Sequence, residues 1–263
     1  MTAAPINLLD TDNCIRFNFK DFKQSYNVEI TINDGQDISV ISYKTAIHYA
    51  KTFDKSYHLV EVTKSDFLIN FNDPESVFED FFLKCGRALS RCVFQVSIHN
   101  DILGLDNHDE ILDKWNAIKQ QIEEDNTGEI LENEIRRFEF KIKNKELLLS
   151  KLKKDSFIHN YFFPVYEIPF HGFELKGKEH FSFFNVDYEN NVVLNIQNEG
   201  KFGKDKHVMV TKKLNENEIN DLLLPIALYE TEYRFDKLLK IEKIVGKFLN
   251  NEREYGFEIE KSD

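Results

Sequence analysis

Residues 107–155 read NHDEILDKWNAIKQQIEEDNTGEILENEIRRFEFKIKNKELLLSKLKKD, and they show the clearest periodicity in the chain. Apolar residues recur at spacings of four and three, the pattern of two paired helices. The first helix carries Ile111, Trp115, Ile118 and Ile122, and the second carries Leu131, Ile135, Phe138, Ile142, Leu149 and Leu152. Residues 125–128, Asp-Asn-Thr-Gly, supply a turn between the two helices. The stretch therefore predicts a long helical hairpin inserted mid-chain.

The second helix is expected to run without a break from Glu129 to Lys154, a length of roughly 39 Å at 1.5 Å per residue. One position of its apolar seam is occupied by Lys145, with Lys141 and Lys143 close by. Two interpretations remain open. Either the helices satisfy the seam with each other and with the sheet, or Lys141, Lys143 and Lys145 mark where the second helix meets another chain. These three lysines are the candidate interaction site.

Strand patterns flank the predicted hairpin on both sides. Apolar residues alternate along 26–32, and Asn33-Asp34-Gly35 favours a turn into a strand at 37–43. A single helix is expected to begin with Asp73 as its N-cap and Pro74 in its first turn. Three closing strands are expected at 228–235, 239–246 and 253–260. Because strands group in antiparallel runs, the fold class is α+β, with curved sheets packed on helices.

The chain has 263 residues, and no stretch rich in Pro, Gly or Ser separates its halves. We therefore expect a single α+β domain over residues 1–263 that carries the helical hairpin at 107–155. The alternative is two small sheet domains, 1–106 and 156–263, joined by the hairpin.

The charge balance limits the classes of partner. A formal net charge of -12 argues against nucleic acid and against an anionic membrane surface, since both require a basic face. An acidic chain suits a basic protein partner. No run of about 18 apolar residues is present, so no membrane span is expected.

Other composition features point to the bacterial cytoplasm. The N-terminus lacks the basic and apolar regions of a secretory signal. Cys14, Cys85 and Cys92 lack metal or redox spacing and are interpreted as reduced thiols. Abundant Phe, Asn, Lys and Ile indicate an AT-rich bacterial coding bias.

No catalytic motif stands out. The eight histidines are scattered, and His108 lies at an expected helix start, where a structural role is favoured. His171 and His180 could approach each other, but surface histidines near a turn are the simpler interpretation. No nucleophile elbow or phosphate-binding loop is present, so no cofactor and no metal are predicted.

Aromatic side chains supply a second candidate site. A curved sheet packed on a helix can enclose an apolar cavity, and core packing is the alternative role for the same rings. The candidate lining residues are Phe78, Phe81, Phe82, Phe162, Phe181 and Phe183.

Three functions follow, in order of preference. The first is a non-enzymatic, cytoplasmic bacterial protein-interaction module that acts in an assembly or neutralises a basic protein partner. The second is a carrier or sensor that binds an apolar small molecule in a curved-sheet cavity. The third is a hydrolase with a site assembled from distant His and carboxylate residues. The sequence does not define the oligomeric state.

Overall fold

A computed structural model describes residues 22–53, 56–72, 76–125, 128–162, 174–181, 192–202, 208–214, 226–236, 240–250 and 254–262. Its strands are β1 (Lys23–Asn33), β2 (Ile38–Phe53), β3 (Tyr57–Ile69), β4 (Arg91–Ser97), β5 (Ile102–Leu105), β6 (Glu174–Phe181), β7 (Val192–Phe202), β8 (Val208–Leu214), β9 (Ile226–Phe235), β10 (Ile241–Asn250) and β11 (Glu254–Lys261). Its helices are α1 (Val77–Ala88), α2 (His108–Asp125), α3 (Glu129–Lys143), α4 (Lys145–Leu152) and α5 (Ser156–Tyr161).

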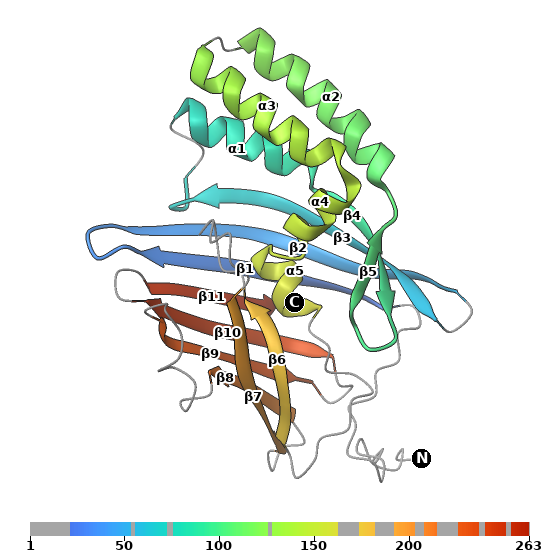
Figure 1. Ribbon diagram of the computed structural model, residues 1–263, viewed down its shortest axis with the longest axis vertical. Coiled ribbons are helices and arrows are strands. Elements are labelled where there is room, and N and C mark those ends of the chain that lie inside the picture. Colours follow the sequence, from blue (N-terminus) through green and yellow to red (C-terminus); the bar gives the residue numbers. More distant parts are fainter. Residues whose placement is uncertain are drawn as a thin grey trace.

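The strands form one antiparallel sheet in the order β5-β4-β3-β2-β1-β11-β10-β9-β8-β7-β6. Each half of the chain is a meander, and the two meanders meet where β1 pairs with β11. The sheet twists strongly, so that β6 and β7 run steeply across the direction of β9 and β10 (Figure 1). The prediction of an α+β fold with an antiparallel sheet is confirmed.

Strand β1 shows why the sheet has one buried face. Its burial alternates from residue to residue, with Tyr26, Val28 and Ile30 buried between exposed neighbours. The turn into β2 follows its sequence: Gly35 has φ 88°, and the Asp34 side chain accepts hydrogen bonds from the backbone N–H of Gln36 (3.1 Å) and Asp37 (2.9 Å).

Helices α1, α2 and α3 lie together beyond β3 and β4, at the top of Figure 1. The rings of Trp115 on α2 and Phe138 on α3 lie 4.6 Å apart between centroids. The Nε2 atom of His108, at the start of α2, lies 2.8 Å from the carbonyl oxygen of Ile142 near the end of α3. His108 thus links the two helices, as expected of a structural histidine.

Two helix boundaries differ from the sequence prediction. Helix α1 is capped by Ser76, whose Oγ accepts from the Glu79 N–H, while the Glu79 carboxylate accepts from the Ser76 N–H. The prediction of Asp73 as N-cap is therefore wrong. The predicted continuous helix from Glu129 to Lys154 is also wrong, because the chain breaks at Asn144 (φ -95°, ψ 106°).

Helices α2 to α5 connect β5, at one edge of the sheet, with β6, at the other. Along this segment α4 contacts β5, and α5 lies over β1 (Figure 1). Tyr26 of β1 contacts α5 through Phe157 (5.9 Å) and Tyr161 (5.4 Å), measured between ring centroids. One hydrophobic cluster includes these rings together with residues of both halves, such as Val60 and Ile259. The single-domain organisation stays a prediction.

Candidate functional site

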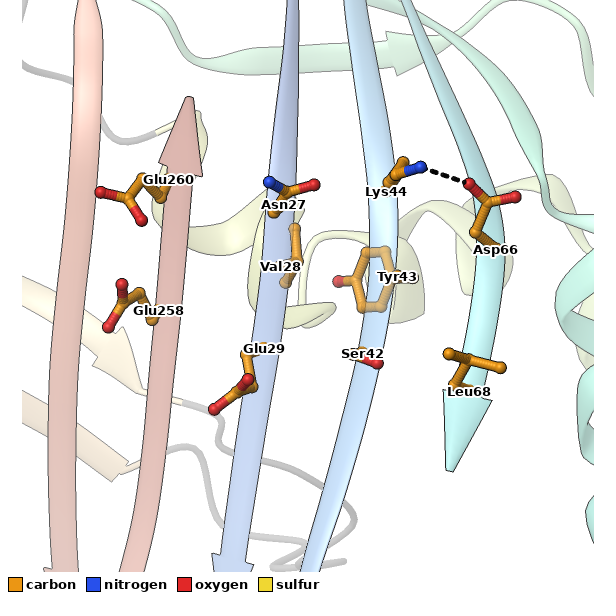
Figure 2. A pocket seen from close by; sticks show the side chains of 10 residues that line it. All are labelled: Asn27, Val28, Glu29, Ser42, Tyr43, Lys44, Asp66, Leu68, Glu258 and Glu260. Atoms are coloured by element: carbon orange, nitrogen blue, oxygen red, sulfur yellow. Dashed lines mark ion pairs between the residues drawn. The ribbon is translucent and has the colours of Figure 1, made fainter. Parts of the chain in front are cut away.

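The exposed face of the sheet contains a hollow of about 510 Å3 at its centre (Figure 2). Strands β11, β1, β2 and β3 lie side by side here, although β11 and β1 come from opposite ends of the chain. Every second residue of these strands points to the exposed face, and these residues supply the polar groups of the hollow. We call it the acidic hollow. Its lining residues are Asn27, Val28, Glu29, Ser42, Tyr43, Lys44, Asp66, Leu68, Glu258 and Glu260.

The carboxylates of the acidic hollow are unequally compensated. Lys44 pairs with Asp66 at 3.0 Å. Lys243, beside the hollow on β10, contacts both Glu258 and Glu260, and its hydrogen bond to Glu258 is the main cause of a raised Lys243 pKa. Among the described residues, Glu29 has neither an ion pair nor a side-chain hydrogen bond.

Glu29 also lies directly opposite Glu258 in the register of β1 and β11. Like charges at directly opposed positions of a sheet destabilise it. The hollow therefore carries an excess of negative charge at the junction between the two halves of the sheet.

A second hollow, also of about 510 Å3, lies between α1, α2 and the C-terminal half of β3. Three cationic side chains and three apolar side chains line it together with two serines and one carboxylate. We call it the cationic pocket. Its lining residues are Lys64, Ser65, Asp66, Phe67, Leu83, Arg87, Ser90, Lys114 and Ile118.

A bulge in β3 brings residues of this strand to both hollows. Ser42 pairs with Leu68 and Lys44 pairs with Ser65, so β3 has one residue more than β2 in this interval. Asp66 sits in the bulge with φ 55°. Asp66 consequently lines the acidic hollow and the cationic pocket, while Phe67 stacks on Tyr43 at 5.0 Å between ring centroids.

The cations of the second hollow differ in their partners. The Lys64 side chain is only 11% exposed, pairs with Asp155 at 2.6 Å and lies over the ring of Tyr43. Lys114 donates a hydrogen bond to the Ser90 hydroxyl at 2.6 Å. Neither Lys114 nor Arg87 forms an ion pair in the part of the chain that the structure describes.

The Cys92 thiol lies close enough to this pocket for the charges of Lys64 and Lys114 to act on it. Burial raises the pKa of Cys92 to about 12, and the positive charges of Lys64 and Lys114 act in the opposite direction. Asp155, which pairs with Lys64, acts in the same direction as burial.

The structure places the three lysines of the predicted interaction site around the break between α3 and α4. Lys141, Lys143 and Lys145 are all exposed. Lys143 pairs with Glu139 at 2.8 Å on its own helix, and Lys145 is the first residue of α4. Because the helix restarts there, Lys145 is not a gap in one continuous seam. A role in binding another chain stays a prediction.

The aromatic residues predicted to line an apolar cavity are divided between surface and core. Phe78 and Phe82 are 42% and 58% exposed on α1, while Phe81 and Phe162 are buried. Phe181 ends β6, and its side chain is not described; Phe183 lies outside the described residues. The described rings pair separately, Phe81 with Phe82 and Phe94 with Phe162.

Sequence reasoning missed both hollows. Lys64, Arg87 and Lys114 belong to three separate segments that carry no binding motif, and only packing of α1 and α2 on β3 assembles them. Glu29 and Glu258 could be recognised as outward-facing from strand alternation. Their pairing depends on the register of β1 with β11, for which the sequence carried no signal.

No family model and no curated protein matches this sequence. A solved structure concerned with lipid–protein interactions in lipovitellin is similar over 94% of this chain and 26% of that chain, with 10% identity and a TM-score of 0.49. The likeness is too distant to support a conclusion about fold or function.

None of the described helices is both long enough and apolar enough to cross a membrane. The described residues contain no group of three or more His, Cys, Asp or Glu side chains arranged to hold a metal ion.

Proposed function

We propose that the protein is a non-enzymatic interaction module whose acidic hollow binds a basic segment of a protein partner. The observation that carries this proposal is Glu29, a carboxylate without an ion pair among the described residues that lies opposite Glu258. A lysine or arginine side chain of a partner would supply the counter-charge that Glu29 lacks, beside Glu258, which Lys243 already pairs.

The energetics favour such a partner over an empty hollow. Opposed carboxylates weaken the pairing of β1 with β11 by a few tenths of a kcal/mol up to about 1 kcal/mol. A bound cation would reduce this repulsion and gain charge-assisted hydrogen bonds to the carboxylate oxygen atoms of Glu29. The hollow volume of about 510 Å3 exceeds what one long basic side chain needs.

The charge of the whole chain acts in the same direction. A net charge of -12 attracts a basic partner over distances of about one Debye length and raises the rate of encounter. This long-range attraction is nonspecific, whereas the register of Glu29 with Glu258 gives one definite place to bind.

We also propose that the protein works in the cytoplasm of a bacterium, as its composition suggests. Cys85 and Cys92 are free thiols, which suits a reducing compartment.

Binding of a short oligolysine peptide, measured by calorimetry at low and moderate salt, tests the proposal. Glu29→Gln is expected to weaken binding at least about tenfold, since a hydrogen bond to a charged group contributes roughly 1.5–3 kcal/mol. Glu146→Gln, at an exposed position of α4, is the matched control and should leave the affinity within about twofold. Equal losses in both variants would show nonspecific attraction and reject the site.

Thermal unfolding of the same variants separates binding from stability. Removing the repulsion should make Glu29→Gln slightly more stable than the parent protein in the absence of peptide. If Glu29→Gln is more stable and still binds oligolysine with full affinity, Glu29 destabilises the sheet without contributing to binding. That result would contradict the proposal.

A further inference from the structure

We propose that the cationic pocket is a binding site for a small amphipathic anion, a carboxylate or phosphate head attached to an apolar body. The proposal does not depend on the acidic hollow. It combines the charges, the apolar wall and the dimensions of the pocket.

The charges are the first argument. The chain has 46 acidic and 34 basic residues, yet three of the basic residues face one pocket with a single lining carboxylate, Asp66. Asp66 is engaged by Lys44 at 3.0 Å. Arg87 and Lys114 therefore lack a carboxylate partner among the described residues while acidic residues are in excess. Cations that line one pocket repel each other, and an anion bound in the pocket would reduce that repulsion.

The donors around the pocket suit an oxyanion. Arg87 offers a planar fork that binds two oxygen atoms of a carboxylate or phosphate. Lys114 holds the Ser90 hydroxyl oxygen at 2.6 Å, which leaves the Ser90 proton available as a further donor. Ser65 contributes a second hydroxyl from β3.

The apolar wall is the second argument. Phe67, Leu83 and Ile118 line the pocket from three different elements and are only partly buried. Phe67 and Ile118 pack against the hydrophobic core on their other sides. An apolar group beside them would complete their burial, which a simple inorganic anion cannot do.

The third argument is that the pocket is preformed. The Lys64 side chain is held by Asp155, which also accepts a hydrogen bond from the Ile158 N–H at the start of α5. The Lys64 backbone N–H donates to the Ser90 carbonyl at 2.7 Å, so the two sides of the pocket are joined directly. A volume of about 510 Å3 falls within the usual range of small-molecule sites, roughly 300–1,000 Å3.

Arg87 also has a local structural role, because it lies in the last turn of α1, where a cation complements the helix dipole. Lys114 lies in the middle of α2 and has no such role. Lys114 is therefore the residue that tests ligand binding most directly.

The experiment uses 8-anilinonaphthalene-1-sulfonate, an amphipathic anion that fluoresces when bound, titrated with the full chain. Decanoate and decyl phosphate should displace the dye, whereas decyltrimethylammonium and inorganic phosphate should not. Displacement by only one of the two anions would identify the head group. Equal displacement by decyltrimethylammonium would show a merely apolar surface and overturn the proposal.

Variants locate the bound dye. Lys114→Gln should weaken dye binding about tenfold, from the loss of one charge-assisted contact, and Lys114→Arg should retain it. Lys151→Gln, exposed on α4 and outside both hollows, should bind the dye as the parent protein does. Unchanged affinity in Lys114→Gln would overturn the proposal. If Lys114→Gln fails to fold, Leu83→Gln tests the apolar wall, and full affinity in that variant would equally overturn it.

Discussion

Gly246 lies directly beneath an aromatic ring in the middle of β10. Its register partner on β11 is Phe257, and a Cβ atom added to Gly246 would lie 2.1 Å from the Cε1 and Cζ atoms of that ring. Phe257 is only 4% exposed, so its ring has no free space to enter. The absence of a side chain at residue 246 is therefore a packing requirement, and its φ angle plays no part.

Gly246→Ala is expected to destabilise the protein by about 1–3 kcal/mol, because the Phe257 ring must leave its place in a packed core. Urea denaturation measures the loss. In a Phe257→Ala background the same glycine substitution should have almost no further effect, since the ring is gone. An equal loss in both backgrounds would show that the contact is not the cause.

The two described thiols are also defined by burial. Desolvation raises the pKa of Cys85 and of Cys92 to about 12, from a reference value of 9.0. Both thiols should therefore resist Ellman's reagent at pH 8 in the folded protein and react fully after denaturation. The Cys14→Ser variant removes the third cysteine from the count. Rapid reaction of either thiol in the native state would contradict the burial.

The same pKa shifts predict that the free energy of unfolding falls as the pH rises above 9. An unfolded chain ionises these thiols near pH 9.0, while the folded chain holds their protons until pH about 12. The stabilisation is thus fully present below pH 9 and is lost as the pH rises toward 12. Urea midpoints measured between pH 8 and 10.5 should fall with rising pH.

At the scale of elements, the break at Asn144 explains why the apolar periodicity wrongly placed Lys145 inside one continuous helix. The apolar spacing predicted one helix through Lys145, yet the Asn144 side chain accepts the Leu147 N–H at 3.0 Å and begins a new helix. Asparagine is a favoured N-cap, and this local signal stood against the longer-range apolar repeat. Strand alternation, by contrast, predicted the location of β1 and of the three closing strands well.

Asn144→Ala removes the N-cap of α4 and is expected to destabilise the protein by about 1 kcal/mol. Asn144→Asp should keep most of the stability, since its carboxylate accepts the same hydrogen bond. Asn133→Ala, at an exposed position inside α3, is the matched control and should be neutral or slightly stabilising. A gain of stability in Asn144→Ala would indicate that α3 and α4 can fuse into one helix.

At the scale of the whole molecule, the sequence predicted the fold class but not the assembly of the sheet. Alternation identifies which residues of a strand face the core, but it does not identify which strand lies beside it. The pairing of Tyr26 with Lys261 joins opposite ends of the chain and follows from global packing. Both hollows depend on such long-range placement, which is why no single segment predicted them.

The single-domain organisation can be tested through Trp115, the one tryptophan of the chain, which lies on α2. Phe257→Ala, on β11 in the other half, should lower the urea midpoint reported by Trp115 fluorescence by as much as the midpoint reported by circular dichroism. Two independent sheet domains would instead leave the fluorescence transition unchanged.

The meeting of β1 with β11 also has a consequence during synthesis on the ribosome. Strand β1 can pair with β2 soon after both emerge, but its other side must wait for residues 254–261. Until then β1 is the unprotected edge of a half-built sheet, with Tyr26, Val28 and Ile30 along it. Such an edge invites pairing with another nascent chain. Slow translation of the second half should therefore favour aggregation, and chaperones that shield nascent chains should suppress it.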